Sequence, residues 1–214
     1  MPRQNRVTPF GDIIVSPARG MLMGNRGCLH DASGRIIKRS ARAAWIYCLL
    51  EFKGRKRQPL MAPGQYTELF FLDEATALAA GHRPCAECQR GRYKVFLQHW
   101  GAANAERLAN GNLDAKMLDV VLQQERIDST GSKAKHRASL GTVPAGCFVM
   151  LDERPDDAYL VQNAGLRMWH PEGYDPRIAV PTDVDVAVLT PPSVANAFAA
   201  GFSPHVADNT PRAA

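Results

Sequence analysis

The chain has 214 residues, of which 45% are hydrophobic and 22% are charged, as in an ordinary globular protein that can fold without disulfides. The apolar runs WIYCLL and LFFL are too short to cross a bilayer, so we expect no membrane span. The first residues, MPRQNRVTPFGDIIV, lack the apolar core of a secretory signal, and five cysteines fit a reducing compartment. We therefore expect a cytoplasmic protein.

The net charge of +5 is distributed unevenly along the chain. Residues 1–100 carry 16 Lys and Arg against 7 Asp and Glu, a net charge of +9. Residues 101–214 carry 10 against 14, a net charge of −4. A basic first half indicates a polyanionic partner, most commonly nucleic acid, although a solvated basic surface would have the same composition.

The N-terminal part favours short strands that are joined by turns. Residues 13–15 and the turn-rich segment 19–30 predict a strand, a Gly-Asn turn and a second strand. Residues 38–51 mix helix formers with aromatic and β-branched residues, which favours a short helix passing into a strand over 45–52. The basic segment 53–66 contains prolines and a glycine that exclude regular structure.

A strand followed by a capped helix is predicted next. Residues 67–72 (TELFFL) favour a strand, and Asp73 is a suitable N-cap for a helix with the body ATALAA. Gly81 stands at the position where a left-handed residue ends a helix. The chain then enters a tight turn that contains Cys85 and Cys88.

The remaining elements suggest helices followed by a small antiparallel sheet or barrel. We expect helical structure over 89–126, a loop over 129–146, and a last helix that Thr190 caps. The tail from Ser203 is expected to be loosely ordered. Short strands separated by turns are predicted over 147–151, 158–161, 166–169 and 185–189.

The pair Cys85-x-x-Cys88 has the spacing of half a tetrahedral zinc site. A redox pair of the thioredoxin type has the same spacing, but such a motif opens a helix after a strand, whereas this pair follows the end of a helix. We therefore favour a Zn²⁺ site. The other candidate ligands are Cys28, His30 and Cys48 upstream and Cys147 downstream.

Several of these features together resemble the metal-binding domain of the Ada methylation-repair protein and related small zinc modules. They are the strand-turn GNRGCLH, a later cysteine, a strand, the helix ATALAAGHRPC and the final CxxC, over about residues 19–92. The resemblance implies that His30, Cys48, Cys85 and Cys88 bind zinc. Cys28 is the alternative first ligand, and Cys48 could instead be a buried core thiol. In the family the first two ligands are usually only a few residues apart, whereas here a long basic insertion separates them.

The resemblance also bears on chemistry. In Ada the first-ligand thiolate accepts a methyl group from a damaged phosphate, which a zinc-bound imidazole cannot do. With His30 as a ligand we therefore expect a site that organises a basic surface. His82 takes the place of an aromatic residue in the family, which suggests packing or nucleic-acid contact.

Twelve basic residues lie near the proposed ligands in the sequence, interspersed with Tyr47, Tyr66 and Tyr93. Zinc would tie their loops together beside a phosphate backbone, so we expect these residues to bind nucleic acid. They are Arg26, Arg35, Lys38, Arg39, Arg42, Lys53, Arg55, Lys56, Arg57, Arg83, Arg90 and Arg92.

Two stretches of the second half could carry chemistry. The segment STGSKAKHR holds Lys133 and His136, a possible proton carrier beside a phosphate-binding charge, although a polar linker would look the same. The segment WHPEGY, residues 169–174, could line a pocket or pack at the end of a sheet. No nucleotide, hydrolase or metalloprotease motif is present, so no reaction class is indicated.

These observations predict an α+β protein with an Ada-like zinc-binding module and a β-rich C-terminal portion. We expect the module with its basic loops over 1–100, a helical connector over 101–140 and the β-rich portion with a C-terminal helix over 141–214. The predicted function is that of a zinc-containing DNA-binding protein in DNA repair or processing, with DNA favoured over RNA. The alternative is a nuclease or base-processing enzyme in which the zinc module positions a nucleic acid and the second half carries the chemistry.

Overall fold

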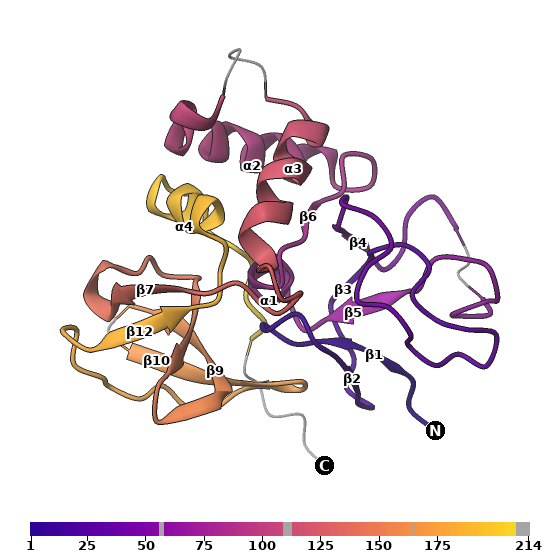
Figure 1. Ribbon diagram of the computed structural model, residues 1–214, viewed down its shortest axis with the longest axis horizontal. Coiled ribbons are helices and arrows are strands. Elements are labelled where there is room, and N and C mark those ends of the chain that lie inside the picture. Colours follow the sequence, from indigo (N-terminus) through magenta and orange to yellow (C-terminus); the bar gives the residue numbers. More distant parts are fainter. Residues whose placement is uncertain (56–57, 109–112, 164, 209–214) are drawn as a thin grey trace.

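The computed structural model describes residues 1–55, 58–108, 113–163 and 165–208, and shows a mixed α+β fold with two sheets (Figure 1). The first sheet contains β1 (Gln4–Val7), β2 (Ile13–Val15), β3 (Leu22–Asn25), β4 (Ile46–Leu49), β5 (Leu69–Phe71) and β6 (Arg83–Pro84). Its strand order is β2-β1-β5-β3-β4-β6, in which β1 and β5 are parallel, as are β4 and β6.

The second sheet is antiparallel throughout. It contains β7 (His136–Ser139), β8 (Phe148–Leu151), β9 (Arg154–Gln162), β10 (Gly165–His170), β11 (Gly173–Tyr174) and β12 (Asp185–Val188). The strand order is β11-β10-β9-β8-β12-β7. The strand β7 and the 3₁₀ turn η2 (Leu140–Thr142) lie within residues 129–146, where we expected only a loop, because β7 pairs with the distant β12.

The helices lie between and above the two sheets in Figure 1. They are α1 (Glu74–Ala79), α2 (Arg90–Ala103), α3 (Ala115–Arg126) and α4 (Pro192–Ala199), with the 3₁₀ turn η1 (Ala105–Arg107) after α2. The described residues 38–45 form no helix, because Ala41 N bonds to Arg26 O (2.8 Å) and the Trp45 side chain is buried. Among the described helices, none is both long and apolar enough to span a membrane.

Both sheets contribute to one cluster of buried apolar side chains. Leu69 and Phe71 come from the first sheet, Val149 and Val161 from the second, and Trp100 from α2. The boundary expected between 100 and 101 falls inside α2, and the one expected between 140 and 141 falls inside η2. Helix α3 adds further side chains to the same cluster, so all three expected segments contribute to one hydrophobic core.

The first turn of α1 contacts the second sheet and the C-terminal segment. Asp73 caps Thr76 N (2.8 Å), as its position predicts, and also accepts bonds from Tyr174 OH (2.6 Å) and Ala207 N (2.9 Å). The carbonyl oxygen of His205 accepts from the first N–H groups of the helix. The tail is therefore fixed as far as Ala207, contrary to the expected loose order from Ser203, because α1 needs partners for its free N–H groups.

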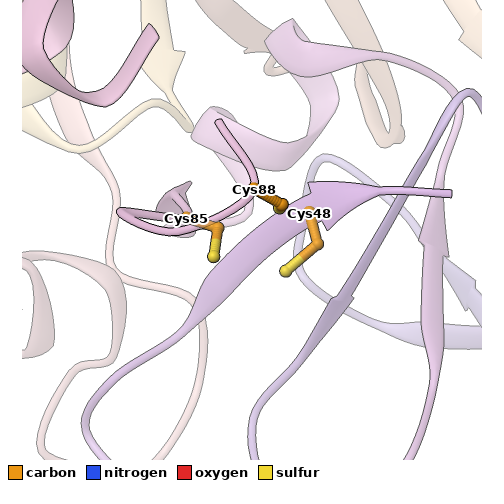
Figure 2. A group of neighbouring side chains, drawn as sticks. All are labelled: Cys48, Cys85 and Cys88. Atoms are coloured by element: carbon orange, nitrogen blue, oxygen red, sulfur yellow. The ribbon is translucent and has the colours of Figure 1, made fainter. Parts of the chain in front are cut away.

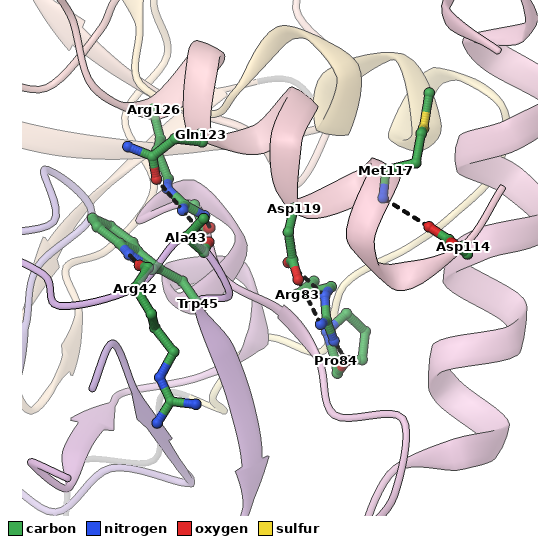
Figure 3. Close-up of polar contacts among 11 residues, drawn as sticks. Arg42, Ala43, Trp45, Arg83, Pro84, Asp114, Met117, Asp119, Gln123 and Arg126 are labelled. Carbon is green, nitrogen blue, oxygen red and sulfur yellow. Dashed lines mark hydrogen bonds and ion pairs between the residues drawn. The ribbon is translucent and has the colours of Figure 1, made fainter. Parts of the chain in front are cut away.

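Helix α3 is tied to the first sheet by two buried arginines (Figure 3). Arg83, in β6, donates two bonds to the Asp119 carboxylate, at 2.7 and 2.8 Å. Arg126, in the last turn of α3, donates to the carbonyl oxygens of Gly81 (2.9 Å) and Ala43, and stacks over the Trp45 ring at 4.0 Å. These contacts fix the segment from Gly81 to Arg83, which precedes Cys85, against α3.

Candidate metal centre

Three cysteine sulfurs lie together at one edge of the first sheet (Figure 2). The Sγ atoms of Cys48, Cys85 and Cys88 are all within 4.8 Å of one another, which places them to hold a metal ion. Cys48 is buried, whereas Cys85 and Cys88 are half-buried. These three cysteines are among the four residues that the sequence assigned to a metal ion.

The pairing of β4 with β6 brings the three cysteines together. Gly81 adopts φ +88° and ends α1, after which β6 runs parallel to β4 with Tyr47 opposite Pro84. The next residue, Cys85, bonds through its N–H to Tyr47 O (2.9 Å) and so lies beside Cys48. Short-range signals thus create the turn, and the strand register supplies the third thiol.

Backbone N–H groups point at two of the three sulfurs. Glu87 N lies 3.4 Å from Cys85 Sγ, and Leu49 N lies 3.4 Å from Cys88 Sγ. Hydrogen bonding with the Cys48 thiol, together with backbone N–H groups, lowers the pKa of Cys85 to about 5. The same contact and burial raise the pKa of Cys48. The Cys85 thiolate is therefore favoured, and deprotonation of Cys48 requires a bound cation.

His30 does not belong to this cluster, although the resemblance assigned it to the metal. Its Nδ1 lies 2.6 Å from Thr67 Oγ1 and its Nε2 lies 3.2 Å from Ala62 O, so both ring nitrogens have other partners. The alternative, Cys28, is also outside the cluster, with its Sγ directed at His30 O (3.7 Å). Cys28 and His30 both follow the end of β3, whereas Cys48 lies in β4 and pairs with Met23 of β3.

The other cysteine and the redox alternative can also be placed. Cys147 is fully buried and lies outside the cluster, and burial raises its pKa to about 12. The Cys85–Cys88 turn follows β6 and precedes α2, so the position of the helix no longer argues against a redox pair. The proximity of Cys48 as a third sulfur donor favours a metal centre instead.

A cavity of about 770 Å³ lies along the first sheet, and its lining includes Met23, the strand partner of Cys48, but none of the three cysteines. Its floor includes Met23 and Phe70, which pair with each other across β3 and β5. Cys48 is the partner of Met23 on the other side of β3, so these side chains project from the same face of the sheet. The rest of the wall comes from the segment after β4, namely Leu50, Glu51, Phe52, Lys53, Gly54, Arg55, Gln58 and Leu60.

Sequence reasoning missed this cavity. The apolar residues Phe52 and Leu60 inside an otherwise basic segment were the only available signal. Phe52 is partly buried, with the Lys53 ammonium 5.2 Å and the Arg55 guanidinium 5.5 Å from the centre of its ring. The segment therefore combines exposed cations with an aromatic surface.

Seven of the twelve basic residues expected to bind nucleic acid are exposed. Arg35, Arg39 and Arg55 form ion pairs with Asp31, Asp12 and Glu87, respectively. The other four, for which the described residues show no ion pair, are Lys38, Arg42, Lys53 and Arg90. Lys56 and Arg57 lie outside the described residues.

Arg26 and Arg83 are buried, which removes them from a phosphate-binding surface. Arg26 stacks at 3.9 Å over the face of Trp45 and bonds to Gly11 O (2.9 Å), and burial lowers its pKa to about 9. Arg92 is half-buried, pairs with Glu74 at 2.6 Å and stacks over a phenylalanine. Their charges serve internal packing, which composition could not reveal.

His82 is fully buried and has a packing role. Its ring lies 4.6 Å from that of Phe71 and 5.2 Å from that of Trp45, and its Nε2 accepts from Arg26 Nε (3.2 Å). Burial lowers its pKa well below the ordinary value, so the ring stays neutral beside the arginine. This excludes the alternative of nucleic-acid contact in the described structure.

The catalytic candidates of the second half have structural partners. Lys133 Nζ donates to Ala79 O at the end of α1, and His136 is half-buried in β7. In the segment WHPEGY, Trp169 Nε1 bonds to Thr76 Oγ1 (3.1 Å) and Tyr174 OH bonds to Asp73. The segment therefore packs the second sheet against α1, one of its two expected roles.

Comparison with protein-family models, with curated proteins and with solved structures finds no match for this chain. The likeness to the Ada metal-binding domain therefore rests on the sequence motifs, and the cysteine cluster is the part of it that the structure supports.

Proposed function

We propose that this chain is a zinc-containing DNA-binding protein with a role in DNA repair or DNA processing. The observation that carries the proposal is the convergence of Cys48, Cys85 and Cys88 directly beside an exposed basic segment. Thiolates suit zinc, and metal binding would fix the strand end from which that segment leaves. The nearby cations would then face a phosphate backbone as a group.

The chemistry of the segment after β4 suits nucleic acid better than a merely soluble surface. Lys53 and Arg55 supply charge for phosphates, and Phe52 supplies a ring on which an unpaired base could stack. Lys38 and Arg42 lie on the loop between β3 and β4, so they extend the charge along the same module. Since residues 101–214 carry a net charge of −4, binding is assigned to the first half.

The first test is metal content. Purified wild-type protein is expected to carry one zinc per chain, and Cys48→Ser, Cys85→Ser and Cys88→Ser should each lower that content sharply. Cys147→Ser is the control, because that thiol lies outside the cluster. Full zinc content in the Cys48→Ser variant would contradict the three-thiolate centre.

The second test is a salt titration of binding to duplex DNA, single-stranded DNA and RNA of equal length. The triple variant Lys38→Ala, Arg42→Ala and Lys53→Ala should weaken binding for all DNA sequences alike. Its slope of log affinity against log salt should fall by about 0.9 for each lost contact with duplex phosphate. The matched control removes three exposed cations of the second half: Lys116, Lys135 and Arg177.

The outcomes separate the alternatives. Equal binding by wild type, the first triple variant and metal-depleted protein would reject the proposal. Tighter binding to RNA than to DNA would reject its DNA assignment. The enzymatic alternative predicts nuclease or base-processing activity that His136→Ala abolishes while binding is retained, whereas the binding proposal predicts binding without turnover.

A further inference from the structure

We propose that the fourth coordination position of the Cys48–Cys85–Cys88 metal centre is exchangeable and takes a monodentate anionic donor from outside the chain, which enters through the adjoining cavity. This inference rests on the metal part of the proposed function. The inference goes beyond the proposed function, because a purely structural zinc site has four protein ligands. An open fourth position would instead allow the bound ion to coordinate a ligand from outside the chain.

The count of donors is the first argument. Within the described ranges, the group of His, Cys, Asp and Glu side chains at this place has only three members. The residues outside those ranges contain none of these four residue types, so no further donor of this kind is hidden there. A tetrahedral ion bound by the three sulfurs therefore has one position left.

Two of three alternative donors have other partners. Glu87 follows Cys85 by two residues, but its carboxylate receives two bonds from Arg55, at 3.2 and 2.5 Å. The two ring nitrogens of His30 are bonded to Thr67 and Ala62, as described above. Glu51 is exposed and lines the cavity, so it is the protein side chain that a test must remove.

The cavity supplies a route and a place for the outside ligand. Its volume of about 770 Å³ lies within the range of small-molecule sites. Met23 forms part of its wall and stands opposite Cys48 in the sheet, and Leu50 follows Cys48 by two residues. Figure 2 shows Cys48 on β4, with Cys85 and Cys88 in the turn beside that strand. A ligand in this cavity would thus lie beside the cluster.

Charge decides the class of ligand. Three thiolates around a divalent ion give a net charge of −1, and an added anion raises this to −2, which requires nearby cations. Lys53 and Arg55 line the cavity against one carboxylate, that of Glu51. Arg55 pairs with Glu87 and also interacts electrostatically with Cys85 and Cys88. Because Met23, Leu50, Phe52, Leu60 and Phe70 form an apolar part of the wall, a small soft anion with little need of hydration fits best.

The test uses cobalt(II) in place of zinc in the full chain, because its visible absorption reports the ligands and geometry of the ion. Thiocyanate is the anionic probe and imidazole is the neutral one, each titrated anaerobically. We expect thiocyanate to shift the d–d bands saturably. Leu60→Trp, which reduces the cavity, should raise the half-saturating concentration about tenfold or more while cobalt stays bound. Val120→Trp, on the exposed side of α3, is the matched control and should behave as wild type.

A second set of variants tests the number of protein ligands and the contribution of the Lys53 charge. Cys28→Ser, His30→Gln and Glu51→Gln should leave the spectrum without added ligand unchanged. Lys53→Ala should weaken thiocyanate binding by up to about fivefold and leave imidazole binding unaffected. An unchanged spectrum at saturating thiocyanate would overturn the inference, as would a changed initial spectrum in any of the first three variants. Failure of wild-type protein to bind cobalt would overturn the metal centre itself, and is therefore a distinct result.

Discussion

Replacing Asp119 by alanine leaves the Arg83 guanidinium buried without its carboxylate. The two side chains are 10% and 8% exposed, and their two bonds measure 2.7 and 2.8 Å. Removing one partner of such a buried pair costs about 3–5 kcal/mol in the free energy of unfolding. For 214 residues, with an unfolding entropy of ~2.1 cal/mol/K per residue, the midpoint of thermal unfolding should fall by about 7–11 °C.

The chain offers a matched control for this prediction. Arg137 and Asp152 also form a two-bond pair, at 2.5 and 2.8 Å, but their side chains are 52% and 60% exposed. Asp152→Ala should therefore cost less than about 1 kcal/mol. The double variant Arg83→Met and Asp119→Leu should recover most of the stability, because no buried charge is left unpaired. Urea and thermal unfolding of these variants measure the differences, and equal losses for Asp119→Ala and Asp152→Ala would refute the reasoning.

Two further predictions concern the same region. Gly81→Ala should lower the free energy of unfolding by about 1–3 kcal/mol, because φ is +88° and the new Cβ would lie 2.6 Å from Arg126 Cδ. Gly54→Ala is the control: its φ is +65° but the space around it is open, so only backbone strain of about 1 kcal/mol is expected. Burial, and then Arg26 and Arg126, lower the pKa of Lys133 from 10.5 to about 7. Between these two pH values Lys133 is therefore protonated in the unfolded chain and neutral in the folded one. Stability should therefore rise with pH across that window by up to ~1.4 kcal/mol per pH unit, and urea unfolding of Lys133→Met should lack this slope. Parallel pH profiles for the two proteins would contradict this.

The local signals of the sequence predicted the elements that hold the CxxC turn. An N-cap aspartate, an alanine-rich body and a left-handed glycine act within a few residues of one another, so Asp73 and Gly81 bounded α1 correctly. Short β-like runs separated by turn residues likewise indicated most strands of the second sheet. The Cys85 and Cys88 pair needed no more than this, because its geometry is set by the backbone turn between the two residues.

Long-range pairing decided the rest of the site. Cys48 joins the cluster because β6 lies parallel to β4 in a particular register, whereas His30 lies beyond the end of β3 and bonds to Thr67. No spacing along the chain contains that information, since the separation of two ligands in space depends on which strands pair. The resemblance therefore gave three cluster residues and one that lies elsewhere.

Burial was likewise a property of the tertiary structure. From the basic composition of the first half we expected Arg26 and Arg83 to be surface charges. Both are buried by elements that are distant in sequence. An arginine is internal where an aromatic face, carbonyl oxygens or a carboxylate can replace its water, as Trp45 and Asp119 do here. The sequence by itself determined the overall charge and the local turns, and only the packing of α3 and both sheets decided which of those charges remain exposed.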